Sequence, residues 1–111
     1  MNAFKVEKTL LDNNFILALS GELDASSSVT ADQAIEQAIN LAPETLIIEC
    51  SRLSYVSSAG LGVFLAAYQA CQQKEVAFVF TELQPKIKNI FSILGLDKIF
   101  TITDTIQHAL T

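Results

Sequence analysis

Residues 45–80, TLIIECSRLSYVSSAGLGVFLAAYQACQQKEVAFVF, contain two short apolar runs with a helical pattern between them. The runs cover residues 45–50 and 75–80, and each has the composition of a strand that is buried on both faces. Between the runs, large apolar residues recur at three- and four-residue spacing: Leu61, Phe64, Leu65 and Tyr68. This spacing is typical of a helix. A strand, a helix and a second apolar strand predict a parallel βαβ unit with a right-handed crossover.

The segments before this unit predict a hairpin and a second helix. Residues 4–10 and 15–19 are rich in apolar residues, and turn-forming Asp12-Asn13-Asn14 separates them. Residues 20–28 form a polar loop in this interpretation, with Gly21 free to adopt backbone angles that other residues avoid. Residues 31–42 have alanines and isoleucines on one side and polar residues on the other, which predicts an amphipathic helix ended by Pro43.

The segments after the unit predict two further helices. Residues 85–94 begin with proline and are followed by Gly95, which is typical of the start and the end of a helix. Residues 98–100 are a short edge strand in this interpretation, and residues 104–107 resemble a capping box that opens a last short helix. The order of elements predicts an α/β fold in one domain over residues 1–111, with a mixed, mostly parallel central sheet of about four or five strands and about four helices.

Composition argues against several classes of partner. The chain has 111 residues, 50% of them hydrophobic, and a net charge of −5. Its seven Lys and Arg are scattered, so no basic surface is available for nucleic acid or for anionic lipid. No apolar run reaches the ~18–20 residues of a membrane span, and the charged start of the chain is unlike a signal peptide. We therefore expect a cytoplasmic protein without membrane insertion, whose two cysteines are buried thiols.

Chemistry-bearing residues are sparse. The single histidine, His108, could complete a hydrolase triad with Ser57 or Ser58 only if the fold brought them together. Val56 occupies the position where the hydrolase motif G-x-S-x-G requires glycine. No phosphate-binding glycine loop and no metal-ligand spacing occurs. We therefore expect no enzymatic activity, no metal and no cofactor.

The position of Ser57-Ser58 is more informative than their chemistry. They follow a central strand and open the next helix, at the carboxyl edge where open parallel sheets meet ligands and partners. The simplest structural role is that Ser58 is the N-cap of this helix, worth ~1 kcal/mol. The polar segment GELDASSS (21–28) also follows a strand, so we expect it near the same edge.

Three segments resemble one family over nearly the whole chain. LSYVSSAGLGVFLAAYQ (53–69) resembles the signature of STAS domains of the anti-sigma factor antagonist type. LSGELDASS (19–27) is similar to the first conserved loop of that family, and residues 85–110 are similar to its C-terminal part. The resemblance implies a STAS-like fold without enzymatic activity.

The resemblance also implies a function and a site. Family members of this type bind an anti-sigma factor that is a serine kinase of the histidine-kinase-like ATPase type, and this binding releases a sigma factor. The kinase inactivates the antagonist by phosphorylating one serine, and a serine phosphatase reverses the modification. Alignment on Gly60 implies Ser58 as the acceptor and Asp24 as a kinase contact. The implied partner-binding residues are Glu22, Asp24, Ser26, Ser57, Ser58, Ala59 and Gly60.

The sequence departs from the family pattern at three positions. Ser57 and Glu49 stand where the family often has aspartate, and Ala59 replaces a second serine. The first change makes Ser57 an alternative acceptor. It also fits a second hypothesis, in which the chain is a constitutive STAS subunit of a lipid-transport ABC complex or a signalling scaffold and is not phosphorylated.

Overall fold

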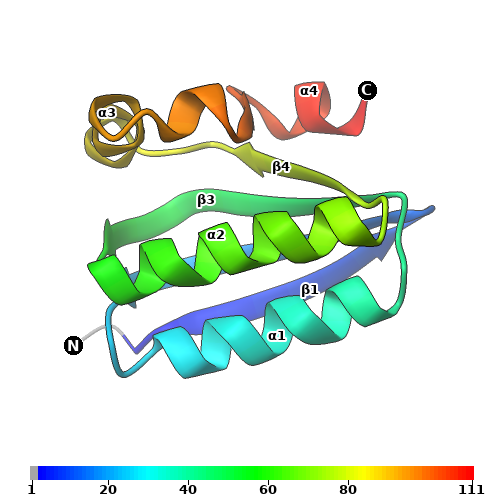
Figure 1. The fold of residues 1–111 in the computed structure, drawn as a ribbon, viewed down its shortest axis with the longest axis horizontal. Helices are drawn as coiled ribbons and strands as arrows, with labels where there is room; N and C mark the ends of the chain where they lie inside the picture. Colours follow the sequence, from blue (N-terminus) through cyan, green and yellow to red (C-terminus); the bar gives the residue numbers. More distant parts are fainter. Residues whose placement is uncertain (1–2) are drawn as a thin grey trace.

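Five strands form one sheet in the order β1-β2-β3-β4-β5 in the computed structural model, which describes residues 3–111 (Figure 1). Strand β1 pairs antiparallel with β2, and the other neighbours pair in parallel. The mixed, mostly parallel sheet and the βαβ unit over residues 45–80 are therefore confirmed. The strands are β1 (Lys5–Leu11), β2 (Asn14–Leu23), β3 (Thr45–Val56), β4 (Ala77–Thr81) and β5 (Thr101–Thr103).

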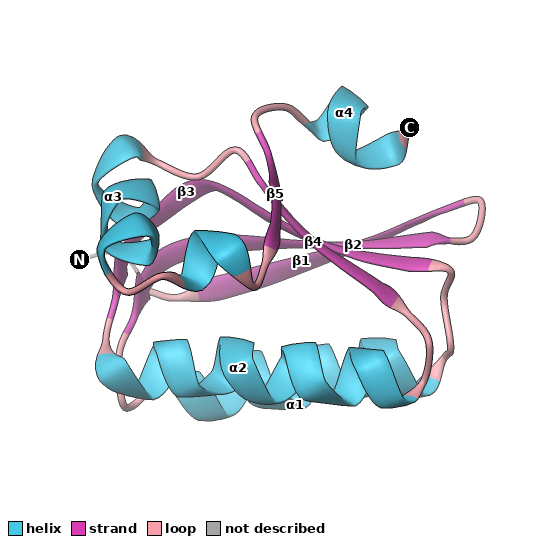
Figure 2. Cartoon of the chain, turned by 45° about the horizontal axis from the view of Figure 1, so that its top comes forward, coloured by secondary structure: helices cyan, strands magenta, loops and turns pink. Residues whose placement is uncertain are grey.

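Helices lie on both faces of this sheet. The long helices α1 and α2 lie side by side on one face, and α4 lies on the opposite face (Figures 1 and 2). The helical segments are α1 (Ser28–Asn40), α2 (Ser58–Gln73), α3 (Pro85–Ile93), the 3-10 helix η1 (Leu96–Lys98) and α4 (Ile106–Leu110). The four expected helices are confirmed, and α1 begins three residues earlier than its apolar pattern.

The core lies between the sheet and the pair α1 and α2. Alternate residues of β2 point to this side and are buried, which is the period of two that a strand imposes. Beside them an aromatic cluster joins α2, β4, α3 and the segment after η1. The centroids of its contacting rings lie between 4.9 and 6.3 Å apart, mostly in edge-to-face geometry. The cluster consists of Phe64, Phe78, Phe80, Phe91 and Phe100.

Several element boundaries differ from the sequence-based prediction. Strand β3 continues to Val56, and β2 continues to Leu23, because these two ends pair with each other beyond an irregularity in the register. The loop between β2 and α1 is correspondingly short. The edge strand expected at 98–100 lies at 101–103, because backbone hydrogen bonds from Lys98 and Ile99 close the 3-10 helix that follows Gly95.

The capping box expected at 104–107 is also wrong. Thr105 is the N-cap of α4, since its hydroxyl accepts from the His108 N–H at 3.2 Å. Asp104 forms a salt bridge with Lys88 of α3 at 3.1 Å.

Candidate functional site

Two loops meet at the carboxyl edge of β2 and β3. Leu23 pairs with Val56 in the sheet register, and the Ser57 N–H donates to the Leu23 carbonyl oxygen at 2.8 Å. Asp24, which follows Leu23 in the first loop, and Ser58, which follows Ser57 as the first residue of α2, therefore lie at the same edge. The structure thus brings together the two polar segments that the sequence analysis expected at one edge.

Gly60 allows the first turn of α2 to pack closely on β2. A Cβ atom at this buried glycine would lie 2.8 Å from Cγ of Leu23 and 3.0 Å from Cγ1 of Val56. Both neighbours are buried core side chains. Any larger residue at position 60 would therefore push the start of α2 away from the loop that carries Asp24.

Ser57 is the N-cap of α2. Its backbone is extended (φ −83°, ψ 175°), and its Oγ accepts a hydrogen bond from the Gly60 N–H at 3.2 Å. The prediction that Ser58 is the cap is therefore wrong, because Ser58 is already the first helical residue. The Ser58 side chain is exposed, and its hydroxyl forms no hydrogen bond with residues 3–111. The two serines thus have different structural roles.

The helix N-terminus at Ser58 suits a negative group. Ser58 opens a 16-residue helix whose first turn contains no acidic side chain. The N-terminus of such a helix has unpaired N–H groups and about half a positive charge. A phosphate on Ser58 would therefore be compatible with the helix that carries it.

Asp24 is held rigidly within its own turn. Its carboxylate accepts from the Ser26 hydroxyl at 2.8 Å, and from the Ser27 N–H and hydroxyl at 3.0 Å each. The Ser27 N–H is the largest cause of a lowered pKa for Asp24, followed by the hydroxyls of Ser26 and Ser27. Asp24 is therefore ionised at neutral pH. Together with exposed Glu22, it makes this side of the site acidic.

Two exposed apolar side chains near this edge were missed by the sequence analysis. Tyr55, which pairs with Glu22 in the register, is 46% exposed, and Val29 in the first turn of α1 is 60% exposed. The exposure of Val29 could have been predicted from the sequence, because Val29 lies outside the apolar stripe of its helix. With Glu22 and Asp24, these two side chains give this edge both apolar and charged groups, a combination that protein interfaces also contain.

The structure separates the other candidate groups from this edge. His108 lies on α4, at the opposite end of the molecule from the start of α2 (Figures 1 and 2). The Ser–His arrangement of the hydrolase hypothesis is therefore not assembled. Glu49 accepts from the Ser51 N–H and lines a groove on the sheet face opposite α1 and α2.

The two cysteine thiols are buried away from this edge of the sheet. Cys50 and Cys71 are buried and unpaired, as expected, and burial raises the pKa of Cys71 to about 11. Burial also raises the pKa of Cys50, with a contribution from Glu49. Among residues 3–111, no three His, Cys, Asp or Glu side chains gather as metal ligands would.

The described part of the chain also contains no helix with the length and apolar character needed to cross a bilayer. What remains at the carboxyl edge is an exposed serine, an ordered carboxylate and two apolar side chains. This set of groups suits binding to a macromolecule.

Comparison with known proteins gives consistent matches. A family model described as the STAS domain matches residues 5–109. An anti-sigma F factor antagonist of Paenibacillus polymyxa is 32% identical over 97 residues, which cover 86% of this chain and 83% of the relative. The anti-sigma-F factor antagonist RsfB of Mycobacterium tuberculosis is 28% identical over 105 residues, or 93% of this chain and 85% of the relative. The crystal structure of an anti-sigma factor antagonist from Mycobacterium paratuberculosis superimposes with a TM-score of 0.89 at 25% identity, covering 97% of this chain and 92% of that one.

Proposed function

The chain belongs to the STAS domain family, and we propose that it is an anti-sigma factor antagonist that is switched off by phosphorylation of Ser58. In this proposal it binds a kinase-type anti-sigma factor in the cytoplasm and thereby releases a sigma factor or an analogous regulator. The names of its relatives support the class of partner. The observation that carries the proposal is the free, exposed hydroxyl of Ser58 at the N-terminus of α2, beside the turn of Asp24.

The geometry favours Ser58 over Ser57 as the acceptor. A kinase must reach the hydroxyl and place its oxygen in line with the transferred phosphoryl group. The Ser57 oxygen is half-buried and already accepts the capping hydrogen bond from Gly60. Phosphorylation of Ser57 would disturb that cap, whereas Ser58 has no such role.

A phosphate on Ser58 is expected to act on the partner and not on the fold. It adds about −1.5 to −2 charges, which a helix N-terminus tolerates. The partner surface would be shaped around a hydroxyl and around the existing carboxylates of Glu22 and Asp24. A like-charge clash in such an interface costs on the order of several kcal/mol, and ~1.4 kcal/mol is already a tenfold loss of affinity.

The proposed interface is the carboxyl edge of β2 and β3. Tyr55 and Val29 would supply apolar contacts, and Asp24 would supply a fixed acceptor for a basic or hydroxyl group of the kinase. A serine phosphatase would restore the free hydroxyl. The partner-binding residues in this proposal are Glu22, Asp24, Ser26, Val29, Tyr55, Ser57, Ser58, Ala59 and Gly60.

One observation favours a second candidate function, a constitutive subunit of a larger assembly. Helix α3 and its C-cap expose two adjacent apolar side chains, Ile93 to 74% and Leu94 to 54%, and neither belongs to the residues of the Ser58 site. In a lipid-transport complex or a signalling scaffold, docking through these side chains would leave Ser58 unmodified.

Phosphosite mapping of the protein purified from its native cells separates the two candidates. Partial occupancy of one phosphate on Ser58 that changes with growth condition is expected for the switch. Phosphate on Ser57 would retain the switch but contradict the assignment of the acceptor. Absence of phosphate in every condition, together with stable co-purification of an assembly, would support the constitutive subunit.

A matched pair of variants tests the acceptor directly. With ATP and an extract of the native cells that phosphorylates the natural chain, Ser57→Ala is expected to accept phosphate and Ser58→Ala is not. Circular dichroism of Ser58→Asp should match that of the unmodified chain. Loss of helix in that variant would contradict the idea that the fold survives the added charge.

A further inference from the structure

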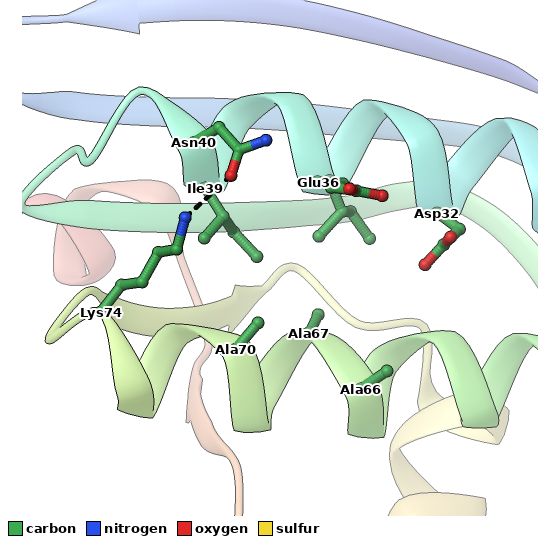
Figure 3. A pocket seen from close by; sticks show the side chains of 9 residues that line it. Asp32, Glu36, Ile39, Asn40, Ala66, Ala67, Ala70 and Lys74 are labelled. Atoms are coloured by element: carbon green, nitrogen blue, oxygen red, sulfur yellow. Dashed lines mark hydrogen bonds between the residues drawn. The ribbon is translucent and has the colours of Figure 1, made fainter.

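A groove of about 330 Å³ runs between α1 and α2 on the side of these helices that faces away from the sheet (Figure 3). Its floor is apolar and consists of Ile35, Ile39 and Ala67, all buried. The remaining lining residues are Asp32, Glu36 and Asn40 of α1 and Ala66, Ala70 and Lys74 at the end of α2. The groove is separate from the Ser58 site and shares no residue with it.

The groove exists because α2 presents short side chains to α1. Ala66 and Ala70 are one helical turn apart and stand opposite the side chains of α1, as Figure 3 shows. A leucine or isoleucine at either position would fill the space between the two helices. The methyl groups leave open space above Ile35 and Ile39, which form the bottom of the groove although their own side chains are only 2% and 3% exposed.

The rim of the groove is acidic. Asp32 and Glu36 are exposed and four residues apart, so they lie one above the other on α1. Neither carboxylate forms a salt bridge with residues 3–111. At the far end the Lys74 ammonium group donates to the Asn40 side-chain oxygen at 2.8 Å and closes the groove. An apolar floor is thus combined with two unpaired negative charges at helical spacing.

We propose that this groove binds an amphipathic helix of a protein partner, with a large apolar side chain on the floor and lysine or arginine residues paired with Asp32 and Glu36. Helices commonly bind in grooves through apolar anchors spaced three or four residues apart. Basic residues one turn apart on such a helix would match the spacing of the two carboxylates. The negative rim disfavours nucleic acid and anionic lipid, because both would bring phosphates against it. The proposal does not depend on phosphorylation of Ser58.

Two designed helical peptides test the proposal on the full chain. They share a leucine ridge, and its flanking positions carry arginine in one peptide and glutamate in the other. Titration into the ¹⁵N-labelled protein is expected to shift amides near Ile35, Ile39 and Ala67 with the arginine peptide. The glutamate peptide should bind at least about tenfold more weakly.

Groove variants make the test specific. Glu36→Gln should weaken binding of the arginine peptide by about three- to tenfold, because one of the two charge partners is lost. Asp97→Asn, which removes a carboxylate outside the groove, should leave binding unchanged. Ala70→Leu should abolish binding by filling the groove between the two helices, and Ala66→Leu serves the same purpose if Ala70→Leu does not fold.

Four outcomes would overturn the proposal, three of them with peptide present and one without. The first three are equal binding of the two peptides, no shift of groove amides with either peptide, and unchanged binding by folded, groove-filled variants. Concentration-dependent shifts of the same amides without peptide would identify a second copy as the occupant and would also overturn it.

Discussion

Ser57 and Ser58 are neighbours in the chain but contribute differently to stability. Ser57→Ala removes the hydroxyl that accepts from Gly60, so it should lower the free energy of unfolding by about 1 kcal/mol. Ser58→Ala removes an exposed, unbonded hydroxyl and should change it by less than about 0.5 kcal/mol. Urea unfolding of both variants measures the difference, and Ser57→Asp serves as a control that retains a capping oxygen. A larger loss for Ser58→Ala would contradict the assigned cap.

The glycines at 60 and 62 are predicted to respond in opposite ways to the same substitution. Gly60→Ala places a Cβ against Leu23 and Val56, and such overpacking typically costs about 1–3 kcal/mol. Gly62→Ala meets no atom within 4 Å on an exposed helix face. It should gain up to ~1 kcal/mol of helix propensity. Thermal unfolding of the two variants gives the comparison, and stabilisation by both would show that α2 is not held against β2.

Asp24 gives the site a pH dependence with a definite sign. Its pKa is lower in the folded chain than in the unfolded one, because the turn donates hydrogen bonds to the carboxylate. Its contribution to stability is therefore complete above the unfolded pKa of about 3.9, and it is lost as the pH falls through the folded value. The stability difference between the natural chain and Asp24→Asn should be constant above about pH 5 and should shrink in more acidic solution. A difference that grows on acidification would contradict the lowered pKa.

The sequence predicted that the polar residues gather at one edge of the sheet, but it did not predict which of the two serines caps α2. The apolar pattern of residues 61–68 is compatible with a helix that starts at either serine. The extended backbone of Ser57 and its hydrogen bond to the Leu23 carbonyl decide the matter, and both are tertiary features. Tyr55 was missed for a related reason, because its exposure depends on how β3 pairs with Glu22.

Elements with their own apolar period were predicted well, and elements that depend on neighbours were not. Helix α1 and the first half of β3 have patterns that identify them locally. Residues 51–56 contain Ser51, Arg52 and Ser54, which do not read as a buried strand. They form the second half of β3 because β2 extends beside them, and the register shifts between Ala18 and Glu22 allow the pairing to continue.

Helix α4 is an element that is stabilised by a side-chain contact with another part of the chain. Its five residues are too few for a helix that is stable in isolation. The Glu82 carboxylate accepts from the Ile106 N–H at 3.0 Å and so ties the start of α4 to the end of β4. Glu82→Ala should therefore increase amide hydrogen exchange in α4 several-fold without affecting α2.

The control for this prediction is Glu82→Gln, which retains an acceptor oxygen at the same position. It should protect the α4 amides nearly as well as glutamate does. Equal protection in Glu82→Ala would show that packing against the sheet holds α4 without this hydrogen bond.

At the scale of the whole molecule, the sequence predicted the helix and sheet layers but not the groove between helices α1 and α2. The parallel connections and the apolar strands determine that helices cover the sheet. The groove between α1 and α2 depends on which alanines of α2 face α1 and which face the sheet. Ala67 is buried whereas Ala66 is exposed, although both belong to the same apolar run. The helix rotation that separates them is set by packing of the entire layer.

The aromatic cluster predicts that the described chain unfolds as one unit. Phe80 is fully buried at its centre and contacts four rings, with centroids 4.9 to 5.4 Å away. These rings belong to Phe64, Phe78, Phe91 and Phe100. Phe80→Ala should cost about 3–5 kcal/mol, a large part of the ~5–15 kcal/mol that stabilises a typical domain.

Two probes show whether that loss is shared by the whole molecule. Far-UV circular dichroism is dominated by α1 and α2. In a Tyr55→Phe background, which leaves Tyr68 as the one tyrosine, tyrosine fluorescence reports the edge contact of Tyr68 with Phe100 at 5.8 Å. Since the cluster joins these parts, both transitions should move together to lower denaturant in Phe80→Ala. Phe4→Ala, a half-buried ring outside the cluster, should shift them much less. If fluorescence were lost before the circular dichroism signal, α3 and the segments after it would form a separate unit, and the Ser58 edge could then respond to a partner without involving them.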